Sequence, residues 1–129
     1  MNWIDNLLKQ HEDFESPISF WRWSALAAIS AVVKDNVWTD RYLYKLYGNI
    51  YVMLYADSGL KKGPPIAMAN KLVALVNNTN IIRGRSSIQA ILKDMGTAIT
   101  LPGGKVKSTN SVFISSSELS SSLVEDPAA

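Results

Sequence analysis

The sequence predicts an α/β protein with a mainly parallel sheet that is preceded by two helices. Apolar residues recur at helical spacing before Lys34, short apolar runs typical of buried strands follow, and helical patterns lie between those runs. Strands that alternate with helices usually belong to a parallel sheet, because neighbouring parallel strands need a long crossover connection. The alternation therefore sets the expected fold class.

The composition is that of one packed domain with few options for metal or thiol chemistry. The chain has 129 residues, of which 47% are hydrophobic, and its formal net charge is only +2. It has no cysteine, which excludes disulfides, cysteine-ligated zinc and thiol nucleophiles, and a single histidine, His11, which we expect to be exposed on a helix. Its lysines and arginines are scattered, so charge alone does not indicate a nucleic-acid partner.

The chain shows no targeting or membrane-spanning pattern. The N-terminus lacks the basic start and long apolar run of a signal peptide. The longest weakly charged apolar stretch, Trp23–Val33, is shorter than the roughly 20 residues that cross a bilayer. We therefore expect a cytoplasmic protein without a membrane partner.

Two helices are predicted before the strands. The first carries apolar residues at helical spacing (Trp3, Ile4, Leu7 and Leu8). Ser16-Pro17 favours the start of the second, because serine can cap free backbone N–H groups and proline fits the first turn of a helix. This second helix is expected to continue to about Lys34.

Two extended segments are predicted next, joined by a turn at Gly48-Asn49. The second segment, Ile50–Tyr55, is continuously apolar, which is typical of a strand buried on both faces. Helical spacing resumes after Pro64-Pro65. Strand, glycine-containing loop and helix thus follow one another in that order.

The rest of the chain continues the alternation. We expect a short strand at Ile81-Ile82, a helix from Ser86 to Met95, a turn at 101–104 within a small hairpin, and a buried strand at 112–114.

Residues 56–63, Ala-Asp-Ser-Gly-Leu-Lys-Lys-Gly, lie between the predicted strand and helix. A phosphate-binding loop needs this context, because its backbone N–H groups surround phosphate oxygens at a helix N-terminus and its lysine adds positive charge. The predicted phosphate-binding residues are Ser58, Gly59, Leu60, Lys61, Lys62 and Gly63. The alternative is a glycine turn with two solvated lysines.

From about Pro17 onward the chain resembles phage and prophage P-loop ATPases of the primase–helicase and RecA-like kind. The resemblance rests on the Ser-Pro-led helix, the Gly-Asn-Ile-Tyr-Val strand, the Ser-Gly-x-x-Lys loop, the Gly-Arg-Ser-Ser-Ile-Gln helix start and the late apolar strand into Ser-Glu-Leu. It implies an N-terminal helical segment, 1–35, and a partial P-loop NTPase (RecA-like) three-layer unit, 36–129, that stops before the last core strands.

The resemblance also implies a site for ATP and Mg²⁺. It places Lys62 at the lysine that contacts the β- and γ-phosphates, Glu118 at the water-activating position, and Ser117 where an aspartate holds magnesium through water. Gly63 replaces a hydroxyl residue that binds magnesium directly. Both departures remove metal-holding groups, so the resemblance implies a chain that binds ATP and hydrolyses little of it. For Glu118 the alternative is a carboxylate stabilised by a helix N-terminus.

Two classes of function remain open at this stage. The resemblance implies a nucleotide-binding module of a phage-type DNA replication ATPase or helicase, with DNA as a partner of the full-length protein and assembly into a homo-oligomer. The alternative is a non-catalytic P-loop relic that serves as a structural or protein-interaction module. The four tryptophans, Trp3, Trp21, Trp23 and Trp38, can stack on bases, but their spacing favours packing in a core or between subunits.

Overall fold

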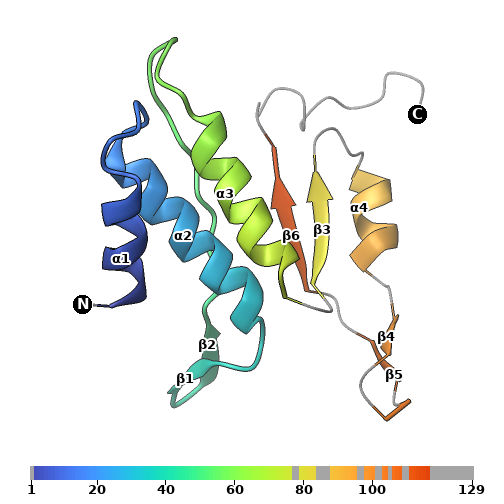
Figure 1. Ribbon diagram of the computed structural model, residues 1–129. Helices are drawn as coiled ribbons and strands as arrows, with labels where there is room; N and C mark the ends of the chain where they lie inside the picture. The colour runs from blue at the N-terminus through green and yellow to red at the C-terminus, as the bar shows by residue number, and fades with distance from the viewer. Residues whose placement is uncertain are drawn as a thin grey trace.

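The computed structural model describes residues 2–76, 79–83, 88–95, 98–100, 103–104, 106–108 and 111–116, which form helices packed side by side and short strands beyond them (Figure 1). The helices are α1 (Trp3–Gln10), α2 (Ile18–Val33), α3 (Gly63–Ala74) and α4 (Ile88–Met95). The strands are β1 (Trp38–Arg41), β2 (Tyr44–Tyr47), β3 (Asn80–Arg83), β4 (Ala98–Thr100), β5 (Val106–Ser108) and β6 (Val112–Ser115). No helix within these ranges has the length and apolar character that a bilayer crossing requires. The α/β class is confirmed.

The first helix begins at a capping box. The Asn2 side chain accepts a hydrogen bond from the Asp5 N–H at 2.9 Å, and the Asp5 carboxylate accepts one from the Asn2 N–H at 3.4 Å. These two bonds satisfy backbone donors that a helix start leaves free. Leu7 and Leu8 on the same helix are buried, as their spacing predicts.

The second helix is confirmed, but Ser16 does not cap it. Pro17 occupies the N-cap position and makes no side-chain cap, so Ser16 lies one residue too early for that role. Its hydroxyl donates instead to the backbone carbonyl of Lys61, at 2.5 Å. The serine that was predicted to cap the start of α2 therefore joins two distant parts of the chain.

The third helix lies between α2 and the β3–β6 pair and carries the core. One buried cluster consists of Leu7, Leu8, Trp21 and Ala25, and the other of Ala28, Ala69 and Val73. Leu72 of α3 packs against both clusters, while Ile81 of β3 and Phe113 of β6 pack against the second. The N-terminal helices and the strands thus share α3 as their common packing surface.

The predicted strands near residues 81 and 113 form a parallel pair. In register, Asn80 lies opposite Val112 and Ile82 opposite Ile114. Ile82 is buried, whereas Ile114 is about half exposed, so β6 is covered on one face only. Among the described strands, β1–β2 and β4–β5 are antiparallel, and the parallel part of the prediction is confirmed only for β3–β6.

The prediction of a strand buried on both faces at Ile50–Tyr55 is wrong. This segment is coil, and Tyr51, Met53 and Tyr55 are 103%, 70% and 89% exposed. Within the described part of the chain, residues 49–55 form no backbone hydrogen bond. A strand exists only where an edge pairs with it, and among the described strands β6 pairs with β3 alone.

The turn predicted at Gly48-Asn49 is also wrong. The chain reverses earlier, at Tyr42-Leu43, so that β1 and β2 form a hairpin in which Trp38 lies opposite Tyr47. Tyr42 has a positive φ of 33°, a conformation for which tyrosine gives no sequence signal. Every residue of both strands is exposed, and Trp38 holds the Lys45 ammonium 4.6 Å from its ring centroid.

Candidate phosphate-binding site

The predicted phosphate loop connects the coil after residue 49 to the start of α3. It lies at the end of the molecule toward which β3 and β6 point (Figure 1). Loops that follow parallel strands gather at this end, but this loop follows coil, so the strand that the phosphate-loop prediction places before it is not formed. All of the predicted phosphate-binding residues, Ser58 through Gly63, are described and lie together in the loop and the first position of α3.

The loop backbone turns at a glycine and keeps free donors. Gly59 has a φ of +101°, a region that side chains with a Cβ rarely adopt, and the Leu60 N–H donates weakly to the Asp57 carbonyl at 3.4 Å. The N–H groups of Ser58, Gly59, Lys61, Lys62 and Gly63 donate to no described residue. These donors are available to water or to an anion.

The two loop lysines occupy different environments. The Nζ of Lys62 lies 3.1 Å from the backbone carbonyl oxygen of Ala56, and the side chain is half-buried. This bond spans the loop from the N-cap residue of α3 to Ala56. Lys61 is exposed and pairs with Glu15. Lys62 is consequently the better-placed cation for a ligand in the loop.

The start of α3 has fewer donors than most helix N-termini. Pro64 and Pro65 occupy its first turn and have no N–H. Gly63 brings no side-chain oxygen, and a Cβ built there would meet no atom within 4 Å. Among the described residues, no group of three His, Cys, Asp or Glu side chains could hold a metal ion. Within the described loop, the groups that could meet a ligand are therefore backbone N–H groups and the lysine ammonium, and Gly63 adds no oxygen.

The end of β6 is fixed to α3. Ser115 donates a hydrogen bond from its hydroxyl to Oδ1 of Asn70, at 2.8 Å. Two predicted site residues that follow, Ser117 and Glu118, lie outside the described residues, and their roles stay predictions.

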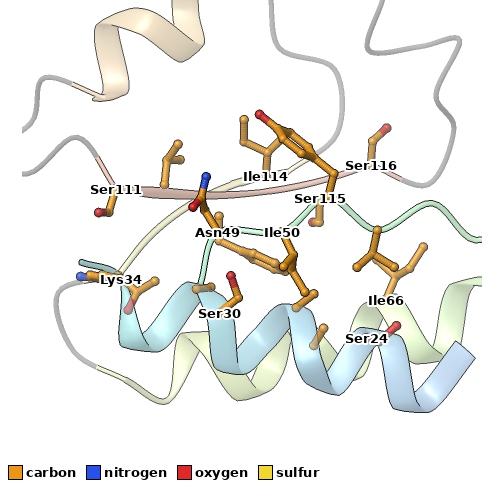
Figure 2. A pocket seen from close by; sticks show the side chains of 18 of the residues that line it. Ser24, Ser30, Lys34, Asn49, Ile50, Ile66, Ser111, Ile114, Ser115 and Ser116 are labelled. Atoms are coloured by element: carbon orange, nitrogen blue, oxygen red, sulfur yellow. The ribbon is translucent and has the colours of Figure 1, made fainter. Parts of the chain in front are cut away.

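A hollow elsewhere in the described structure is separate from this loop. It has a volume of about 790 Å³ and lies between α2, the coil from Asn49 to Leu54, and β6. Figure 2 shows Ser24 and Ser30 on α2 at one side, Ser115 on β6 at the other, and Ile50 between them. None of residues 56–63 lines it. The hollow marks the space between β6 and the coil that the sequence predicts as a strand.

Sequence reasoning missed the contacts that Glu15 and Ser16 make with the loop, because these residues precede it by more than 40 positions.

Sequence reasoning also placed His11 on an exposed surface. His11 is half-buried, its Nδ1 donates to the Leu7 carbonyl at 2.7 Å, and its ring lies 4.1 Å from that of Trp21. A helix C-terminus does favour such a bond, but nothing in the sequence gives the ring contact.

No family model, curated protein or solved structure matches this chain. The loop and its contacts are therefore the observations that bear on function.

Proposed function

We propose that the chain is the nucleotide-binding module of a phage-type DNA replication ATPase or helicase, with the loop at Ser58–Gly63 holding the phosphates of ATP. The observation that carries the proposal is the ammonium of Lys62, held 3.1 Å from the Ala56 carbonyl beside free backbone donors. DNA contact by the full-length protein, self-assembly and a cytoplasmic location extend this proposal from the resemblance alone.

The electrostatics of the loop support phosphate over other ligands. A polyphosphate needs several N–H donors that converge and at least one fixed positive charge. The loop has N–H groups that donate to no described residue, the half-buried Lys62 and a helix start, and its aliphatic content is limited to Ala56 and Leu60. Asp57 is the opposing charge and lowers the affinity expected for an anion.

The test is a calorimetric titration of the chain with ATP, ADP and adenosine, with and without Mg²⁺. We expect ATP to bind at least tenfold tighter than adenosine, because only ATP has phosphate oxygens that can accept hydrogen bonds from the loop N–H groups and pair with the Lys62 ammonium. Affinity should depend little on Mg²⁺, because Gly63 lacks a ligand oxygen. Equal affinity for adenosine and ATP would contradict a phosphate site, and absence of ATP binding would refute the proposed function.

The metal dependence should change when the missing oxygens are supplied. Gly63→Ser combined with Ser117→Asp is expected to make ATP binding more dependent on Mg²⁺, since the first substitution adds a direct ligand and the second a negative charge. Residue 63 has open space for the new side chain. The same titrations provide the measurement, with Gly63→Ala as the control for losing glycine alone. An identical magnesium dependence in the double variant and the control would show that the metal site is not at these positions.

The second candidate is a non-catalytic relic that acts as a structural or protein-interaction module. The exposed β1–β2 hairpin favours it, because Tyr42 and Leu43 at its tip are 103% and 84% exposed and pack against nothing described. Large exposed apolar patches are typical of protein–protein contacts. The two candidates differ in ATP affinity, so the titration above separates them.

A further inference from the structure

Two consecutive residues before α2 contact the same residue of the phosphate loop. Ser16 donates its hydroxyl hydrogen to the Lys61 backbone carbonyl at 2.5 Å, and the Glu15 carboxylate lies 2.5 Å from the Lys61 ammonium. Ser16 is only 5% exposed. One contact therefore holds the main chain of the loop, and the other occupies a side chain of the loop.

The two contacts differ in how solvent affects them. The Ser16 bond is sheltered, so removing the hydroxyl leaves a loop carbonyl without its partner and frees the backbone at Lys61. The Glu15–Lys61 pair is 71% and 60% exposed at its two side chains, so water and salt weaken it and an incoming anion can displace it.

We propose that Glu15 and Ser16 set the affinity of the loop for polyphosphate in opposite directions, Ser16 as a positioning residue and Glu15 as a competitor for Lys61. The inference rests on the proposed function. Ser16 fixes the Lys61 carbonyl, so the neighbouring N–H groups lose less conformational freedom when a phosphate binds. Glu15 acts against binding, because Lys61 must leave its carboxylate before it can approach a phosphate oxygen.

The experiment measures ATP and inorganic triphosphate affinity for wild type and single variants of the whole chain at low salt. Ser16→Ala is expected to weaken binding about fivefold, the effect of one lost sheltered hydrogen bond. Glu15→Gln is expected to strengthen it about threefold, and this gain should vanish in high salt. Each variant has a matched control. Ser24→Ala removes a different buried serine hydroxyl, one on α2, and Glu12→Gln removes an equal charge from the exposed segment that also contains Glu15.

A double-mutant cycle isolates the competition. Lys61→Ala should cancel the gain that Glu15→Gln gives, because without the Lys61 ammonium the Glu15 carboxylate has no loop cation to hold. Amide hydrogen exchange of residues 57–62 without ligand should accelerate in Ser16→Ala and stay unchanged in Ser24→Ala. Faster exchange throughout the chain in Ser16→Ala would assign Ser16 a purely structural role and overturn its part of the proposal.

The outcomes separate this inference from the proposed function. If wild type binds ATP and Lys62→Ala weakens binding, but Ser16→Ala and Glu15→Gln match their controls, the inference is overturned and the phosphate site stands. If wild type binds neither ATP nor triphosphate, both are overturned. Opposite shifts in the two variants, with unchanged controls, support both.

Discussion

Lys62→Ala is expected to weaken ATP binding at least tenfold, or about 1.4 kcal/mol, because it removes the one cation that is held inside the phosphate loop. The Lys62 side chain is half-buried, and its ammonium donates to the Ala56 carbonyl, which is uncharged. A phosphate oxygen would replace or share that partner and gain a charge-assisted hydrogen bond. Calorimetric titration with ATP measures the loss directly.

The controls for this result are two other lysines of the same region. Lys71→Ala removes an exposed positive charge from α3 and is expected to change affinity less than twofold, which excludes a general effect of net charge. Lys61→Ala is likewise expected to be mild, because Lys61 is already paired with Glu15. A larger loss at Lys61 than at Lys62 would show that the loop is aligned one residue out of register.

Trp21→Ala is expected to reduce the free energy of unfolding by about 3–5 kcal/mol, the usual cost of truncating a large buried aromatic side chain. Trp21 is 2% exposed and packs between α1 and α2, with the His11 and Phe14 rings 4.1 and 5.3 Å from its own. Truncating the Trp21 side chain leaves a cavity between α1 and α2. Urea denaturation followed by circular dichroism measures the change.

Two further variants test whether the loss of stability is specific to the buried Trp21 side chain. Trp23→Ala, on the same helix but 51% exposed, is expected to cost less than about 1 kcal/mol. Trp21→Phe keeps most of the apolar area and removes a buried Nε1–H that no described residue accepts, so it should cost much less than Trp21→Ala. If Trp23→Ala proves as damaging as Trp21→Ala, the assignment of Trp21 as the core tryptophan is wrong.

Local pattern predicted the helices well, because each one carries its own signal. Leu7 and Leu8 lie at helical spacing and are buried, and the paired prolines at 64 and 65 occupy the first turn of α3 as their fixed φ favours. A turn at Gly59 was likewise predictable, since glycine readily adopts the positive φ that it has there, but the strand predicted before the loop is coil. Elements that depend on neighbouring residues in the sequence were therefore predictable from the sequence alone.

Long-range pairing could not be predicted in the same way. The apolar run at Ile50–Tyr55 has the composition of a strand, but composition does not specify which edge a strand will meet. In the part of the chain that the structure describes, β6 pairs only with β3. The role of Ser16 was misassigned for a related reason. A serine before a proline satisfies the local rule for a helix cap, and its partner, the Lys61 carbonyl, lies 45 residues away.

The unpaired backbone at Ile50–Tyr55 has a practical consequence for the behaviour of the protein in solution. The six residues combine high β-propensity with no proline, and the chain carries no charge between Lys45 and Asp57. Such segments stack between molecules into cross-β aggregates when their N–H and C=O groups are free, and flanking charges act as gatekeepers against this process. Here those gatekeepers are distant on one side, while Tyr51 and Tyr55 are exposed. We expect self-association through this segment to rise with protein concentration, so dilute samples are the appropriate condition for measuring every affinity proposed above.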